Sequence, residues 1–245
     1  MKFNTNSNTY IIIYSVVMVV IVAVLLSLAA LGLKDRQDAN ALNEKKTQIV
    51  KALGEDPATV AYDSVIAKAV ILDASGAVVS EDVNEVFAAL NDLKGSFAAE
   101  RFPLFVANNG VVAPLYGAGL WGPIWGYIAL DSDMNTVKGI VLDHSGETPG
   151  LGAEITTAKH QAQYVGKSVF EGEELVGITL KKGGADKSNP HEVDAITGGT
   201  KTSDGVSAMI LNSLNYYKPY LNAVRAAAAA EEAESNELNN ENNEQ

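Results

Sequence analysis

A long apolar segment near the N-terminus dominates the hydropathy pattern. Residues 10–33 are mostly Ile, Val, Leu and Ala, and no Asp, Glu, Lys or Arg occurs between Phe3 and Leu33. A helix of this length crosses the roughly 30 Å hydrocarbon layer of a membrane. The rival interpretation is a secretory signal peptide cleaved near residues 27–30. Signal peptides, however, have a shorter apolar core than residues 10–33, and their N-terminal region is more basic than the single Lys2 here. The pattern therefore predicts an uncleaved transmembrane helix.

The pattern changes to amphipathic beyond this segment. Residues 38–53 carry apolar side chains at helical spacing, and Gly54 follows as a stop. We expect this helix to continue or closely follow the membrane helix. Residues 63–70 then predict a short helix, residues 70–72 a strand, and residues 73–76 a turn.

Short strands dominate the middle of the chain. The Asn108-Asn109-Gly110 sequence between two apolar runs is typical of a β-hairpin, and residues 131–135 are rich in turn formers. Residues 155–165 predict a helix, and Ser203-Asp204 predicts the N-terminal cap of a last helix. The expected strands cover residues 103–106, 110–115, 125–130, 137–142 and 175–180.

These elements predict the fold class and the domain limits. Strands outnumber helices and mostly follow one another through hairpins, which favours an α+β domain with an antiparallel sheet. The expected organisation is a short segment at 1–9, the transmembrane helix at 10–33 and a domain at 34–225. Residues 226–245, which are rich in Ala, Glu and Asn, have too few apolar side chains to build a core, so we expect a disordered tail.

Composition excludes several kinds of chemistry. The 245 residues carry a formal net charge of −12, which argues against binding to nucleic acid. Cysteine is absent, so the chain has no disulfide, thiolate metal site, iron–sulfur cluster or cysteine nucleophile. The three histidines lack the spacing of metal ligands, and no glycine pattern matches a nucleotide-binding fingerprint. Any redox cofactor in this chain is therefore of another kind.

Two loops concentrate Gly, Thr and Pro. One is His144–Gly152, directly after a predicted strand, and the other is Asp194–Gly205, directly before the last predicted helix. A Gly-rich and hydroxyl-rich loop before a helix places backbone N–H groups and the positive helix end where a phosphate can bind. A capped helix after a tight turn is the simpler interpretation, but it leaves the threonines at 197, 200 and 202 unexplained.

The second loop, Asp194-Ala-Ile-Thr-Gly-Gly-Thr-Lys-Thr-Ser203, resembles the motif at which FMN is attached covalently. With the Glu147-Thr-Pro-Gly-Leu-Gly152 loop, it is similar to the family of the C subunit of the sodium-translocating NADH:quinone reductase. The G subunit of the related Rnf electron-transport complex shares both loops. The Gly-Leu-Trp-Gly sequence ending at Gly122 and the Lys-Gly-Gly-Ala sequence starting at Lys182 favour the quinone reductase.

The resemblance implies an FMN site. FMN would be linked through its phosphate to Thr202, as an exposed hydroxyl on a loop, without catalysis by this chain. The isoalloxazine ring would lie between Trp121 and Leu151, although Trp121 read alone fits an ordinary core tryptophan. The remaining residues implied in FMN binding are Thr197, Gly198, Gly199, Thr200, Glu147, Thr148, Gly152 and Lys167.

The implied function is that of an electron-transfer subunit of an NADH:quinone oxidoreductase, with no complete active site of its own. The implied partners are the other subunits, the membrane and an FMN transferase. The resemblance places the domain in the periplasm, anchored in a bacterial inner membrane, whereas the basic residues after residue 33 taken literally favour the cytoplasm. Two alternatives stay open: the equivalent Rnf protein, and an assembly module whose loops bind a phosphorylated ligand noncovalently.

Overall fold

The computed structural model describes residues 7–243, and the side chains of residues 7–230. Part of the predicted 1–9 segment and the end of the predicted tail therefore lie outside the described residues. The chain divides into two compact units after Lys45.

The first unit contains the long N-terminal helix as far as Lys45, and the last turns of this helix belong to the second unit. α1 (Asn8–Ala52) begins at Asn8 and runs without a break through the predicted transmembrane segment and the predicted helix at 38–53. Its most apolar 18-residue window has a mean hydropathy of 3.1, and none of that window is buried. By length and composition, α1 is able to cross a membrane.

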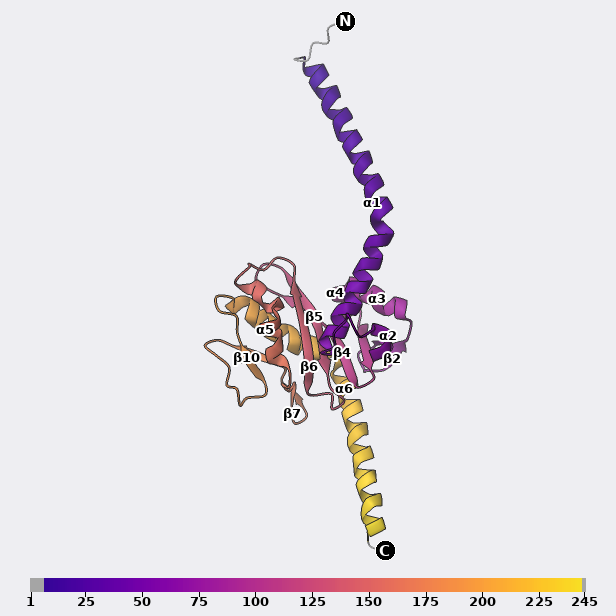
Figure 1. Cartoon of the computed structure of the whole chain (residues 1–245), viewed down its shortest axis with the longest axis vertical. Coiled ribbons are helices and arrows are strands. Elements are labelled where there is room, and N and C mark those ends of the chain that lie inside the picture. The colour runs from indigo at the N-terminus through magenta and orange to yellow at the C-terminus, as the bar shows by residue number, and fades with distance from the viewer. Residues whose placement is uncertain (1–6, 244–245) are drawn as a thin grey trace. The chain divides into compact units, whose positions relative to one another are not determined.

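The second unit is built on a six-stranded antiparallel sheet with the order β2-β1-β3-β4-β5-β6. Figure 1 labels β2, β4, β5 and β6 of this sheet. β3 to β6 form a meander of consecutive hairpins, and the Asn108-Asn109 turn joins β3 to β4 as predicted. The strands are β1 (Ile66–Leu72), β2 (Val78–Ser80), β3 (Phe102–Ala107), β4 (Gly110–Ala118), β5 (Pro123–Leu130) and β6 (Val137–His144). The α+β class with an antiparallel sheet is confirmed.

Both faces of this sheet are buried. Val111, Ala113 and Leu115 of β4 belong to a large apolar core on one face, and Val112 belongs to a second core on the other. The second core contains apolar residues of the α1 end, such as Ile49, and of the helix that follows β2. The helices between α1 and β3 are α2 (Tyr62–Val65), α3 (Val83–Asn91) and α4 (Leu93–Ala98).

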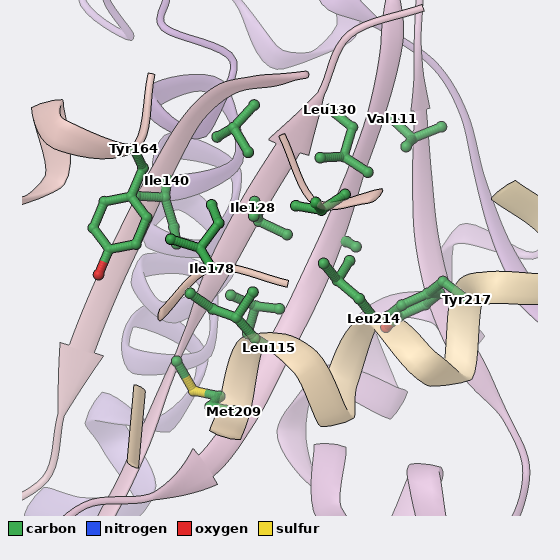
Figure 2. Packing of buried hydrophobic residues seen from close by; sticks show 14 of the residues in the cluster. Val111, Leu115, Ile128, Leu130, Ile140, Tyr164, Ile178, Met209, Leu214 and Tyr217 are labelled. Carbon is green, nitrogen blue, oxygen red and sulfur yellow. The ribbon is translucent and has the colours of Figure 1, made fainter. Parts of the chain in front are cut away.

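The C-terminal helix α6 (Thr200–Asn243) packs against β4 and supplies much of the first core. Met209, Leu214 and Tyr217 point from α6 toward the strands, where Figure 2 shows them facing residues such as Leu115. The Tyr217 hydroxyl donates to the backbone oxygens of Pro103 (3.0 Å) and Pro114 (3.3 Å). These contacts fix α6 against the sheet.

Short elements connect β6 to α6. They are η1 (Gly152–Thr156), α5 (Ala158–Gln161), η2 (Ala162–Tyr164), β7 (Phe170–Glu171), β8 (Glu174–Leu175), β9 (Thr179–Lys181) and β10 (Glu192–Asp194). β9 and β10 are parallel, and β7 and β8 form a small hairpin.

Three predictions of local structure were wrong in their limits. The helix expected at 63–70 ends at Val65, because the β-branched segment that follows pairs with β3. The helix expected at 155–165 is interrupted at Thr157, which is extended and accepts a hydrogen bond from the His160 N–H as an N-cap. The strand expected at 175–180 is broken near Gly177, which has a φ of +68°.

The start of the last helix was also predicted wrongly, and its end differs from expectation. α6 begins at Thr200, and Ser203 lies inside it rather than at its cap. The Ser203 hydroxyl instead bridges the Ile196 N–H and the Gly199 carbonyl oxygen. Beyond Ala226, where we expected disorder, the structure continues α6 to Asn243, since Ala and Glu are strong helix formers. Residues 226–230 are exposed, consistent with the expected lack of apolar burial.

Candidate functional site

Three segments meet at one end of the sheet. Residues 119–122 form the turn between β4 and β5, and residues 145–151 follow β6. Because Ile124 pairs with His144, these two connections leave the sheet at the same end. The start of α6 reaches the same place, since a side chain at Gly152 would meet Thr202. Both Gly-rich loops singled out in the sequence are therefore brought together.

A buried hydrogen bond joins the two loops. The Thr202 hydroxyl donates to Oε2 of Glu147 at 2.6 Å. The other carboxylate oxygen, Oε1, accepts from the backbone N–H of Trp121 at 2.9 Å. Glu147 is 4% exposed and Thr202 is 1% exposed. One carboxylate thus links the turn before β5, the loop after β6 and the first turn of α6.

The environment of Glu147 favours the ionised carboxylate. Burial raises the pKa of this group, and it is the largest single influence. Hydrogen bonds from the Thr202 hydroxyl and from the N–H groups of Trp121 and Leu120, together with the nearby His144, outweigh burial and hold the pKa below its usual value. The Glu147 N–H also donates to Nδ1 of His144 at 3.2 Å. Glu147 is therefore an oriented anion at neutral pH.

Gly152 covers the buried pair closely. A Cβ atom at this position would collide with Oε2 of Glu147 and would lie 2.5 Å from the Thr202 hydroxyl oxygen. Only glycine allows the backbone to pass here without pushing the two side chains apart. The backbone at Gly152 therefore lies directly against the Thr202 hydroxyl and the Glu147 carboxylate.

Exposed apolar side chains belong to the two loops that contact the Glu147–Thr202 pair. Trp121 is 69% exposed, Leu120 53% and Leu151 41%, which is unusual for residues of this size in adjoining loops. Gly198 has a φ of +76°, and a side chain there would meet the Leu151 side chain at 2.6 Å. The Trp121 indole and Leu151 are thus available to contact a flat apolar ligand.

The start of α6 suits a phosphate. The N–H groups of the first helical turn are not used by the helix itself, and the helix dipole places partial positive charge there. Thr197 and Thr200 are exposed beside this end, whereas Gly199 is buried under it. The Thr202 side chain lies in the same turn, so a phosphate ester on its hydroxyl would be close to these donors.

The structure does not place every predicted residue in this site. Lys167 lies at the opposite end of β6, where its backbone oxygen accepts from the Val137 N–H at 2.8 Å and its ammonium donates to the Asn189 carbonyl. Thr148 is exposed in the loop after β6, and its backbone oxygen accepts from the Leu151 N–H. Trp121, Glu147, Leu151, Gly152, Thr197, Gly198, Gly199, Thr200 and Thr202 lie at the site.

The expected setting of Thr202 was wrong. The resemblance implied an exposed hydroxyl on a loop, but Thr202 is buried within the first turn of α6. The Glu147–Thr202 hydrogen bond and the part played by Leu120 and His144 were not foreseen. A contact between residues 55 positions apart leaves no periodic signal in the sequence.

The donors and apolar surfaces of this site fit FMN, with helix amides for the phosphate and Trp121 and Leu151 for the ring. Residues 119–215, which contain all of these groups, match the FMN-binding domain family. The fold and site therefore define an FMN-binding domain.

Known proteins refine this class. The chain is 32% identical over 208 residues to the C subunit of the Na(+)-translocating NADH-quinone reductase of Vibrio vulnificus, covering 75% of this chain and 82% of that protein. The crystal structure of the C subunit from Parabacteroides distasonis has a TM-score of 0.70 at 36% identity, covering 77% of this chain and 96% of the other. That of Shewanella oneidensis NqrC has a TM-score of 0.63 at 27% identity, covering 77% of this chain and 99% of the other.

The chain belongs to the family of the C subunit of the Na(+)-translocating NADH-quinone reductase. Members of this family are subunits of an oxidoreductase complex, and the resemblance seen in the sequence is confirmed.

Proposed function

We propose that this chain is the membrane-anchored electron-transfer subunit of a sodium-translocating NADH:quinone reductase, with FMN joined by a phosphoester to Thr202. The coarser part of the proposal, an FMN-carrying subunit of this complex, is supported by the family and by the FMN-binding domain. The covalent bond is supported by one observation above others. The Thr202 hydroxyl lies where the α6 start, the Trp121 turn and the Leu151 loop converge.

The residues of the site divide the binding of FMN among them. The first turn of α6, with Thr197, Gly198, Gly199 and Thr200, would hold the phosphate. Trp121 and Leu151 would contact the ring, and an aromatic contact of this kind contributes about 0.5–1.5 kcal/mol beyond burial. Glu147 and Gly152 would lie between them. When bound, FMN supplies the electron-carrying chemistry, and the chain supplies position and surroundings.

Attachment at Thr202 requires movement of the chain. A hydroxyl of a residue that is 1% exposed is out of reach for a separate enzyme. The segment around Gly152 must shift to admit the phosphate, and the Glu147–Thr202 hydrogen bond must break when the ester forms. The partners that this function needs are an FMN transferase and the other subunits of the complex.

The proposed organisation places residues 10–33 in a bacterial inner membrane and the domain at 34–225 in the periplasm. The helix α1 supports the anchor. The side of the membrane rests on the resemblance, because large domains that follow a span are translocated with little regard to flanking charge.

Replacement of Thr202 tests the covalent bond. The chain is expressed with an FMN transferase, and its intact mass and in-gel flavin fluorescence are measured after denaturation. We expect one FMN on the wild type, none on Thr202→Ala and one on the control Thr59→Ala, which removes a hydroxyl from an exposed turn. Covalent flavin retained in Thr202→Ala would rule out this attachment site.

A second candidate is noncovalent binding of FMN or of another phosphorylated ligand at the same site. The buried and hydrogen-bonded state of the Thr202 hydroxyl favours it, since no covalent step is then needed. Denaturation separates the two candidates, because a noncovalent flavin leaves the chain and an ester-linked one stays.

A further inference from the structure

The hydrogen bond between Thr202 and Glu147 has the direction that phosphoester formation needs. A threonine hydroxyl is a weak nucleophile until a base begins to remove its proton. Here the proton of Oγ1 already points at Oε2 of Glu147, over a heavy-atom distance of 2.6 Å. This distance lies within the range required of a general base and the group that it deprotonates.

The surroundings of Glu147 make it available as a proton acceptor. The Trp121 N–H fixes Oε1 at 2.9 Å and leaves Oε2 directed at the hydroxyl. The carboxylate is 4% exposed, so little water competes for it. The factors that depress its pKa keep it ionised at neutral pH, and an ionised carboxylate is the form that accepts a proton.

We propose that Glu147 acts as the general base of its own chain's flavinylation, accepting the Thr202 hydroxyl proton as the phosphoester forms. This inference rests on the proposed covalent attachment. It makes Glu147 a residue of the modification reaction, in addition to any contact with the bound flavin.

The chemical step balances with a flavin donor whose FMN phosphate is activated as a pyrophosphate. Oγ1 of Thr202 attacks that phosphorus, and a new O–P bond forms. The bond from the phosphorus to the bridging oxygen breaks, and the second phosphate leaves as a monoester. The proton passes from Oγ1 to Oε2 of Glu147 and then to solvent. No electrons are gained or lost. Protein kinases use an aspartate in the same way on a substrate hydroxyl.

The Glu147→Gln variant removes the ability of the side chain to accept a proton but keeps its size and shape. The amide oxygen can keep the bonds from the backbone N–H groups, and its NH₂ group can still contact the Thr202 oxygen, but the amide cannot accept the proton. The matched control is Glu173→Gln, the same change at an exposed turn. Each purified chain is mixed with an FMN transferase and flavin adenine dinucleotide, and the adduct on Thr202 is followed by intact mass in a single turnover.

We expect Glu147→Gln to be modified about 10²–10⁴-fold more slowly than the wild type, and Glu173→Gln to be unchanged. The rate for Glu147→Gln should rise about tenfold per pH unit between about pH 6 and 8, because hydroxide replaces the base, while the wild-type rate stays flat. A purely structural role for Glu147 would not produce this change in pH profile. Thermal melting of both variants checks that they are folded.

A second variant keeps the inference testable if the amide disturbs the fold. Glu147→Ala leaves space for a small carboxylate, so sodium formate should restore the rate and sodium chloride at equal ionic strength should not. Modification of Glu147→Gln within twofold of the wild-type rate, or equal effects of the two salts, would overturn the role of Glu147. Absence of an adduct on wild-type Thr202 would instead overturn the proposed function itself.

Discussion

Thr202 and Glu147, which are 55 positions apart in the chain, share a 2.6 Å hydrogen bond that connects the first turn of α6 to the loop after β6. Both residues are buried, and the same carboxylate also accepts the Trp121 N–H. The residue proposed to carry FMN is therefore held by the residues that would surround the flavin. Changes at any of the three segments are expected to affect the others.

Gly152→Ala should prevent attachment of FMN without unfolding the domain. The added Cβ would fill the space beside the Thr202 hydroxyl and press on the Glu147 carboxylate. We expect the FMN adduct measured by intact mass to fall at least tenfold. Gly146→Ala is the matched control, because no atom lies within 4 Å of its added Cβ. Equal flavin content in the two variants would show that this space is not used.

Trp121→Ala should change the environment of the flavin but not its attachment. The indole is 69% exposed, so its removal costs the fold little. Because the indole no longer covers the ring, we expect flavin fluorescence in the folded domain to be quenched more strongly by iodide, while the intact mass still shows the Thr202 adduct. Unchanged quenching would mean that Trp121 does not cover the isoalloxazine ring.

Tyr217→Phe should destabilise the domain by about 1–3 kcal/mol. The substitution leaves the buried carbonyl oxygens of Pro103 and Pro114 without the phenolic donor. The free energy of unfolding is measured with urea, and Tyr216→Phe, at a residue that is 39% exposed, serves as the control. A decrease of the same size in both variants would contradict a specific role for the Tyr217 hydroxyl.

Stability should fall as the pH drops from about 6.5 toward 4, because His160 is buried in its neutral form. Burial lowers the pKa of His160 to about 4, although Asp194 opposes the shift. Between these pH values His160 binds a proton in the unfolded chain but not in the folded chain. The free energy of unfolding therefore decreases as pH falls, by at most about 3 kcal/mol.

A His160→Gln variant isolates this contribution. Glutamine cannot take up the proton, so its stability between about pH 6.5 and 5 should be flatter than that of the wild type. Glu147 affects stability at lower pH than His160 does. Its pKa is depressed in the folded chain, so its contribution to the free energy of unfolding is lost only below the ordinary pKa of a carboxyl group. Parallel stability curves for wild type and His160→Gln would contradict the assignment to His160.

The absence of cysteine allows a direct test of membrane orientation. Glu173→Cys places a single thiol on an exposed turn of the domain, and Asn4→Cys places one before the span. In intact cells with a permeable outer membrane, a maleimide that cannot cross the inner membrane should label the first variant and not the second. The reverse pattern would place the domain in the cytoplasm.

Local sequence signals gave most of the fold. The hairpin at Asn108-Asn109-Gly110 and the strands that became β3 to β6 were predicted, because alternation and turn residues act over a few positions. The failures occurred where a distant partner decided the structure. Ile66 joins a strand because β3 lies beside it, and no residue near Ile66 in the sequence signals this pairing.

The sequence indicated most of the residues that form the site, but not how these residues are placed relative to one another. The motif around Thr202 and the Glu147–Gly152 loop were visible as sequence patterns, and the structure brings them together. Burial of Thr202 could not be read from the chain, because it results from the packing of α6 against the sheet. Lys167 was implied by the resemblance, yet it lies at the far end of β6.

Since Thr202 belongs to α6, the direction of its side chain depends on helical register. Tyr217 and Leu214, several turns farther along, are locked against the strands and set the rotation of the whole helix. Each residue of an α-helix is turned by about 100° from the one before. One residue inserted between Thr202 and Val206 would therefore turn the Thr202 hydroxyl to another side of α6. The packing of Leu214 and Tyr217 in the core thus determines the direction in which the proposed FMN attachment site faces.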